Sequence, residues 1–258
     1  MKNNTFIITH KFKEVLQKYN SLSAFDGFRG KLARNLSSLL MSIPAGIDPA
    51  VISAALLESI PAWFFSGKQA CISHIIAPDM GDEDLLNFAD TLADAGRLSF
   101  PFQGIVRIGI PDCIWNHTTH FEQVLTILQP VFSHIIPLFI VTDWDENELS
   151  NLGSRIHAFF PVDLCHISLK DIQKNIISDY FFQSAIHISE DTMKHLMDIT
   201  TDLDYHHLLG MCSGLAANAL SSNDKLISSE QIDTYTRNYH EQKQHTVFRQ
   251  ERNIIGFR

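Results

Sequence analysis

The chain has few of the features that make a function easy to assign. Its four cysteines lie far apart with no C-x-x-C pair, which argues against a disulfide framework or a zinc knuckle. It has no apolar run of about 18 residues for a membrane span, and no signal-peptide core follows the N-terminus. Basic residues number 20 against 29 acidic ones, a net charge of −9, which disfavours nucleic-acid binding by the whole surface. We therefore expect a soluble cytoplasmic protein.

What is present is a globular chain whose first part alternates strand-like and helical patterns. Hydrophobic residues make up 45% of the 258 residues and charged residues 19%, which are ordinary globular values. Ser37–Ile43 and Gly104–Ile110 are apolar enough for buried strands, whereas Asp84–Ala95 and Thr118–Leu128 carry apolar residues at helical spacing. Strands alternating with helices of this length predict a parallel α/β sheet.

The stretch around residues 138–164 gives the clearest local order. Leu138–Val141 predicts a buried strand, followed by an acidic turn over Thr142–Asn147 and a short helix ending at Gly153. A second strand is expected at Ile156–Leu164, directly after Ser154 and Arg155. This predicts two core strands and a polar tip at the edge of the sheet where ligands bind.

After residue 166 the pattern becomes helical. Helices are expected over Ser168–Gln183, Ser189–Thr200, Tyr205–Leu220 and Ser229–His240, with Ser168 and Ser189 as N-caps. The predicted organisation is a leader (1–35), an α/β core (36–166), a small all-α domain (167–240) and a basic, apolar tail (241–258).

The loop after the first strand of the core has the position of a phosphate-binding loop but lacks its residues. Asp48 caps a helix over Ala50–Ser59, with Pro49 at its first position. A working loop reads G-x-x-x-x-G-K-[ST], in which glycines expose N–H groups and the lysine reaches the terminal phosphates. Here Gly46 is alone, two prolines donate no hydrogen bond and no lysine follows. We therefore expect no ATP hydrolysis by this loop.

Together these segments resemble the AAA+ family, especially its clamp-loader-type and transposition- or secretion-associated members. Ser37–Ser59 matches the P-loop strand and helix, Arg107–Asp112 the acidic strand, and Leu138–Thr142 the strand that carries sensor 1. The helices after Ser168 resemble the lid. The resemblance implies a P-loop-like parallel core with a helical lid, and its candidate nucleotide-binding residues are Gly46, Asp48, Asp112, Thr142 and His206.

Ser154-Arg155 matches the Ser-Arg of an arginine finger, so the resemblance implies that Arg155 reaches a neighbouring subunit's nucleotide. The alternative is an arginine at a strand edge that pairs with Asp143 or Asp163.

The departures from the family pattern fall on the catalytic positions. Asp112 is a single carboxylate followed by Cys113, and a histidine (His206 or His207) stands where the lid normally supplies an arginine. We therefore name no catalytic residue and expect no cofactor, with a bound ATP or other nucleotide as the alternative.

Several partial motifs favour ordinary structure over chemistry. Gly67-Lys68 only half-matches a phosphate loop, and Asp143–Asn147 begins like a calcium loop but lacks its glycine and terminal glutamate. Cys212 sits in a G-x-C-x-G pattern inside a helical region, where a nucleophile elbow does not fit. His117 and His120 are one helical turn apart with no identifiable ligand set, so no metal is expected.

The tail is the predicted contact with a partner, because its apolar side chains favour burial against another protein. The docking residues are Val247, Phe248, Ile254, Ile255, Phe257 and Arg258. The sequence thus predicts a catalytically degenerate AAA+-like subunit or adaptor of a multi-subunit cytoplasmic complex. The alternatives are a partner-activated ATPase that works on nucleic acid or a secretion or transposition complex, and DNA binding through the basic tail.

Overall fold

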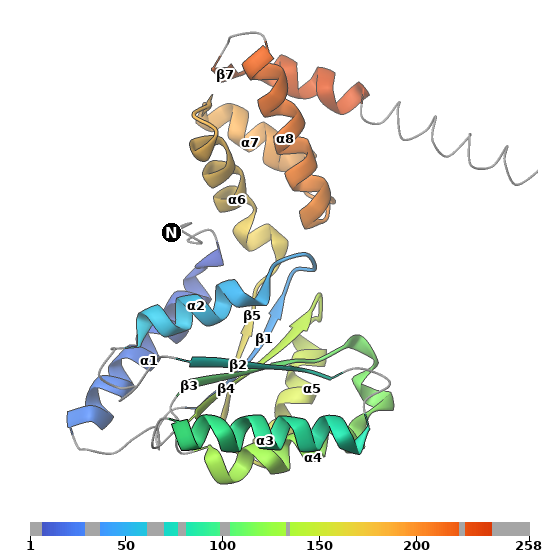
Figure 1. The fold of residues 1–258 in the computed structure, drawn as a ribbon. Coiled ribbons are helices and arrows are strands. Elements are labelled where there is room, and N and C mark those ends of the chain that lie inside the picture. Colours follow the sequence, from blue (N-terminus) through green and yellow to red (C-terminus); the bar gives the residue numbers. More distant parts are fainter. Residues whose placement is uncertain are drawn as a thin grey trace, which may run out of the picture. The chain divides into compact units, whose positions relative to one another are not determined.

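The computed structural model describes residues 7–28, 37–60, 70–76, 81–98, 104–132, 135–221 and 225–238 (Figure 1). The chain divides into two compact units, Met1–Ile172 and Gln173–Arg258. The predicted docking residues of the tail and the Gly67-Lys68 pair lie outside the described residues.

The first unit is built on a five-stranded sheet in which every pairing is parallel. The order across the sheet is β2-β3-β4-β1-β5, so β3, β4 and β1 lie inside it and β2 and β5 form the edges. The strands are β1 (Ser38–Ile43), β2 (Ala70–Ile75), β3 (Gly104–Gly109), β4 (Ile135–Thr142) and β5 (Val162–His166). This confirms the predicted parallel α/β core.

The inner strands are continuous apolar runs because helices cover both of their faces. All six residues of β1 are buried, and so are the first seven residues of β4. In register, Ser42 lies beside Val141 and Ile43 beside Thr142, so both strands end at the same edge.

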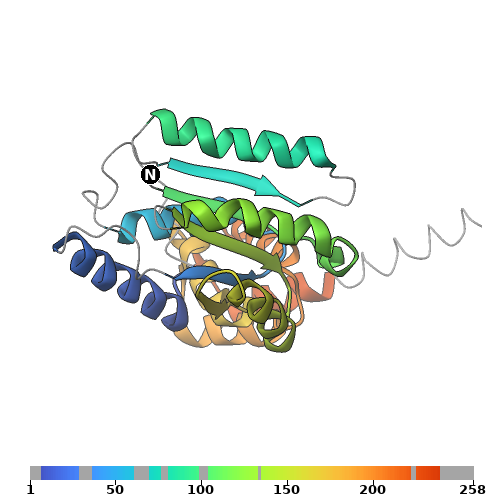
Figure 2. The ribbon, with the colours of Figure 1, turned by 90° about the horizontal axis from the view of Figure 1, so that it is seen from below.

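Helices cover the two faces of the sheet in two groups (Figures 1 and 2). On one face lie α1 (His10–Phe28) and α2 (Pro49–Ser59), and on the other α3 (Asp82–Leu98), α4 (Thr118–Leu128) and α5 (Glu146–His157). Two short 3-10 turns, Asp112–Asn116 and Gln129–Val131, flank α4. The sequence predicted the α4 bounds and the Asp48 cap of α2 correctly.

One apolar core lies between the sheet and α3, α4 and α5. Phe139, at the middle of β4, is fully buried there and contacts the rings of Phe121 and Phe160. On the opposite face, α1 buries Phe12 and Tyr19, and the Tyr19 hydroxyl donates to the Ser37 carbonyl oxygen at 2.6 Å. The N-terminal helix is therefore an integral layer of this unit.

The stretch predicted as helix, Ser-Arg and strand folds differently. The helix does not end at Gly153 but runs on to His157, and β5 begins only at Val162. Gly153 lies inside α5, where the Leu164 side chain approaches the helix so closely that a Cβ at this position would meet it at 2.7 Å. Close packing therefore explains the glycine. Ile156 belongs to the buried face of the helix rather than to a strand. The prediction was wrong because a glycine that permits close packing looks like a helix terminator in sequence.

The second unit is helical, as the sequence predicted. It contains α6 (Leu169–Gln183, which begins in the first unit), α7 (Glu190–Ile199), α8 (Tyr205–Ser221) and a helix over residues 229–238. Two-residue strands, β6 (His187–Ile188) and β7 (Leu226–Ile227), add a short parallel pair. Strands this short carry no period that a sequence pattern reveals.

Candidate functional site at the carboxyl ends of the strands

Four of the predicted site residues come together at one edge of the sheet. Gly46 and Asp48 follow β1, Asp112 follows β3, and Thr142 is the last residue of β4. Because β3, β4 and β1 are neighbours and run in parallel, their carboxyl ends meet there. This is the edge where open α/β sheets bind ligands.

The loop between β1 and α2 is a tight turn with most of its donors already used. Gly46 has φ 88°, a conformation that favours glycine. The Ile47 N–H donates to the Pro44 carbonyl at 3.3 Å, and the Ala50 N–H donates to the Asp48 carboxylate at 2.8 Å. The two flanking prolines have no N–H to offer.

The side chain of Asp143 bonds to this loop from the end of β4. Its carboxylate accepts the Ala45 N–H at 3.0 Å, and its own N–H donates to the Ile43 carbonyl at 3.0 Å. Asp143 has φ 57°, which aspartate tolerates better than most residues. A carboxylate thus occupies a donor that a phosphate-binding loop presents to its ligand. It pairs with this loop and not with Arg155.

Trp144 connects β1, β4 and the segment after β3. The Ser42 hydroxyl donates to the Trp144 carbonyl at 2.8 Å, and the Trp144 indole N–H donates to the Asp112 carboxylate at 3.0 Å. Trp144 is 5% exposed. One oxygen of Asp112, a predicted nucleotide-binding residue, therefore accepts the indole N–H.

ATP fits this arrangement poorly. No lysine follows Gly46, and the carboxylates of Asp48 and Asp143 lie where phosphates need positive charge.

Beside this closed loop lies a cavity of about 390 Å³ that the sequence did not predict. Arg107 of β3, His74 and Ile75 of β2, Asp48 and Thr142 all line it. The Arg107 guanidinium donates to the hydroxyl of Ser53 in α2 at 3.3 Å. The signal that could have revealed it is the single charged residue inside the apolar run of β3.

His74 also packs against the α3–α4 layer. Its ring stacks on Phe88 at 4.4 Å between centroids and lies near-parallel to His120 at 6.1 Å. The Nε2 atoms of both histidines are buried and have no hydrogen-bond partner among the described residues. Burial lowers the pKa of each imidazole, and for His74 the neighbouring His120 lowers it further.

Arg155 is held inside its own unit. It lies in α5, and its guanidinium donates to the Glu122 carboxylate of α4 at 3.0 Å and lies 5.6 Å from the centre of the Phe121 ring. The expected strand-edge pairing with Asp143 or Asp163 is therefore wrong. Asp163 instead pairs with Lys18 at 2.6 Å. The finger role of Arg155 toward a neighbour stays a prediction.

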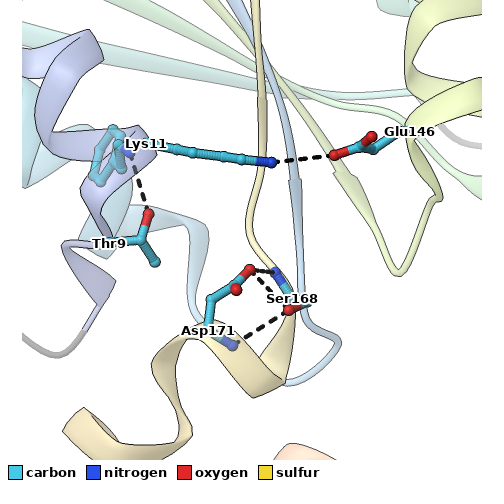
Figure 3. Close-up of polar contacts among 6 residues, drawn as sticks. Thr9, Lys11, Glu146, Ser168 and Asp171 are labelled. Atoms are coloured by element: carbon cyan, nitrogen blue, oxygen red, sulfur yellow. Dashed lines mark hydrogen bonds and ion pairs between the residues drawn. The ribbon is translucent and has the colours of Figure 1, made fainter.

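Several helices start at the same edge of the first unit (Figure 3). Thr9 accepts the Phe12 N–H at 3.2 Å, and Ser168 and Asp171 cap the start of α6 reciprocally. Lys11 of α1 pairs with Glu146 at the start of α5 at 3.1 Å, and this hydrogen bond raises the pKa of the Lys11 ammonium. The pair is exposed and tethers α1 to the start of α5.

In the second unit the predicted His206 is exposed, with its ring edge toward Tyr205. Asp204 caps the start of α8 by accepting the His207 N–H at 2.8 Å, and its carboxylate also bonds the His207 ring at 2.7 Å. Cys212 lies inside α8, fully buried, and burial raises the pKa of its thiol to about 12. Gly214 is needed because Tyr235 occupies the space of a side chain. The pattern around Cys212 is therefore helix packing and not a nucleophile elbow.

Within the described part of the chain, no group of three or more His, Cys, Asp or Glu side chains is arranged to hold a metal ion. Asp145, at the start of the calcium-like segment, caps α5 by accepting the N–H groups of Asn147 and Glu148. Nor is any helix within those residues long and apolar enough to cross a membrane.

No family model matches the chain, and no curated protein matches it in sequence. Solved structures do match its fold. A Thermotoga maritima RuvB variant superposes with a TM-score of 0.57 at 10% identity, over 87% of this chain and 68% of that one. The AAA domain of FIGL-1, solved with ADP, gives 0.60 at 14% identity, over 91% and 82%. A katanin structure concerned with self-assembly gives 0.58 at 14%, over 92% and 84%.

The fold is therefore that of AAA+ ATPase domains, a parallel α/β core with a helical second unit. At these identities the likeness concerns the fold and not the activity.

Proposed function

We propose that this protein is a non-hydrolysing AAA+-like module that acts as a subunit or adaptor of a larger assembly through protein–protein contacts. The observation that carries the proposal is the loop after β1, where Asp143 accepts the Ala45 N–H and no lysine is present. Because it lacks a lysine and most of its N–H donors are already bonded, the loop offers a triphosphate little binding energy.

The remaining catalytic positions support the same proposal. Asp112 is engaged by the Trp144 indole, and the residue after it is Cys113, which is no general base for a water molecule. The fold itself is intact, with an all-parallel sheet and a dense core. A preserved scaffold with altered catalytic positions favours a role in assembly over a role in hydrolysis.

Titration of ATP and Mg²⁺ into the full chain tests the nucleotide part of the proposal. We expect no saturable binding tighter than about 1 mM. Micromolar binding that is lost in an Asp112→Asn variant would contradict the proposal and favour the alternative of a divergent, partner-activated ATPase. An Asp179→Asn variant, altered on α6 far along the chain, is the matched control.

The adaptor part is tested by capture of protein partners from native cells without added nucleotide. The sequence predicts that the tail residues from Val247 to Arg258 take part in docking. We expect the full chain to retain specific partners and a chain lacking residues 253–258 to lose them. Undiminished capture by the shortened chain would remove the tail from the proposal.

A further inference from the structure

The cavity between α2 and the ends of β2, β3 and β4 is lined by Arg107, which forms no ion pair with any residue that the structure describes. Arginine is charged at every physiological pH. The hydrogen-bond partner of Arg107 is the neutral hydroxyl of Ser53, at 3.3 Å. Within the described residues no ion pair joins Arg107 to a carboxylate.

Arg155 provides the comparison within the same unit. It too is only partly exposed, but its charge is paired with Glu122 and its guanidinium lies over Phe121. A partly buried charge that is not paired costs stability. Arg107 therefore favours an anionic group supplied from outside the chain.

The rest of the cavity limits what that group can be attached to. Ile140 and Ile110 add apolar surface, and Ile75, although it lines the cavity, is 66% exposed. Gly109 has no side chain, which leaves room beside Ile75. The volume of about 390 Å³ suits a small molecule.

Asp48 sets the charge of the ligand. Asp48 lines the same cavity, and its carboxylate accepts the Ala50 N–H at 2.8 Å. This negative charge disfavours a doubly charged phosphate more strongly than a singly charged ligand, which can pair directly with Arg107. We propose that this cavity binds a small aliphatic monocarboxylate, with the carboxylate on the Arg107 guanidinium and the aliphatic part against Ile75 and Ile140. The proposal goes beyond the assembly role and holds whether or not ATP binds.

Isovalerate, its neutral analogue isovaleramide and inorganic phosphate are the probes, each titrated into the full chain by isothermal calorimetry up to about 10 mM. We expect saturable binding of isovalerate alone. The amide has nearly the same shape without the charge, so it separates anion recognition from simple apolar filling. Phosphate separates a monocarboxylate site from a general oxyanion site.

Two variants locate the binding. Arg107→Met keeps a long side chain without the charge and should weaken isovalerate binding by about 10-fold or more, as expected for a charge-assisted hydrogen bond. Gly109→Val reduces the space beside Ile75 and should weaken binding while leaving the charge in place. Arg237→Met, which removes an exposed arginine of the second unit, should leave binding unchanged.

Several outcomes would overturn the proposal. One is equal binding of isovalerate and isovaleramide, and another is tighter binding of phosphate than of isovalerate. If isovalerate does not bind to the unaltered chain, the proposal is excluded whatever the variants show. If the Arg107→Met protein is folded by circular dichroism and binds isovalerate with unchanged affinity, Arg107 does not bind the carboxylate and the proposal is overturned.

Discussion

Two neighbouring regions at one edge of the same sheet have opposite characters. Around the loop after β1, polar groups are matched within the chain: Asp143 with Ala45, Ser42 with Trp144, and Trp144 with Asp112. Around Arg107, on the strand that β4 separates from β1, the sheet leaves a cavity and a charge whose partner is a neutral hydroxyl. The first region is closed by its own hydrogen bonds, and the second is open to a ligand.

This difference shows which part of the sheet edge keeps groups that are available to bind a ligand. A loop that satisfies its own donors gains stability but loses the groups that a phosphate would use. The side chains of β3 are positioned by the sheet and not by that loop. A site on β3 therefore does not need the glycines and the lysine of a phosphate-binding loop. Closure of one part of the edge is therefore compatible with a ligand site beside it.

In the closed region, Trp144→Ala is expected to cause the largest loss of stability. Trp144 is 5% exposed and packs within the core formed with α3, α4 and α5. Its truncation is expected to lower the free energy of unfolding by about 3 kcal/mol, since it leaves a cavity and removes the Asp112 partner. Urea denaturation of the full chain measures the change, and a loss below about 1 kcal/mol would contradict the packing argument.

Trp144→Phe is the matched variant that separates packing from hydrogen bonding. It keeps most of the ring and removes the indole N–H that donates to Asp112. Because Asp112 is exposed, water can replace the lost donor, and the expected cost is about 1 kcal/mol. If Trp144→Phe lowers the free energy of unfolding as much as Trp144→Ala does, the hydrogen bond and not the packing of the ring stabilises this edge.

The open region is expected to show a smaller, pH-dependent effect. Burial lowers the pKa of His74 and His120 below that of an ordinary histidine, so the unfolded chain binds protons more readily at these positions. Their contribution to stability is thus complete above the unfolded pKa, about 6.5, and is lost as the pH falls through the lower folded pKa.

A His74→Gln/His120→Gln double variant removes this contribution. Its stability is expected to fall less than that of the unaltered chain between about pH 7 and about pH 5. Urea midpoints measured across that interval give the comparison. Parallel pH profiles for the two proteins would show that these two half-buried histidines do not govern the pH dependence of stability.

The sequence alone determined much of the fold because apolar period and capping chemistry are local. The bounds of α4, the Asp48 cap with Pro49, and the buried strands β1 and β3 followed from residue order. The absence of a lysine after Gly46 was visible in the same way. These features depend on neighbours a few residues apart.

Only the tertiary structure decided what depends on distant residues. Gly153, inside α5, leaves room for the Leu164 side chain of β5. Arg155 of α5 pairs with Glu122 of α4. Asp143 reaches the loop after β1 from the end of β4, and Arg107 lines a cavity formed by four separate segments. No sequence pattern encodes such contacts, because the partners become neighbours only when the parallel strands are ordered in the sheet.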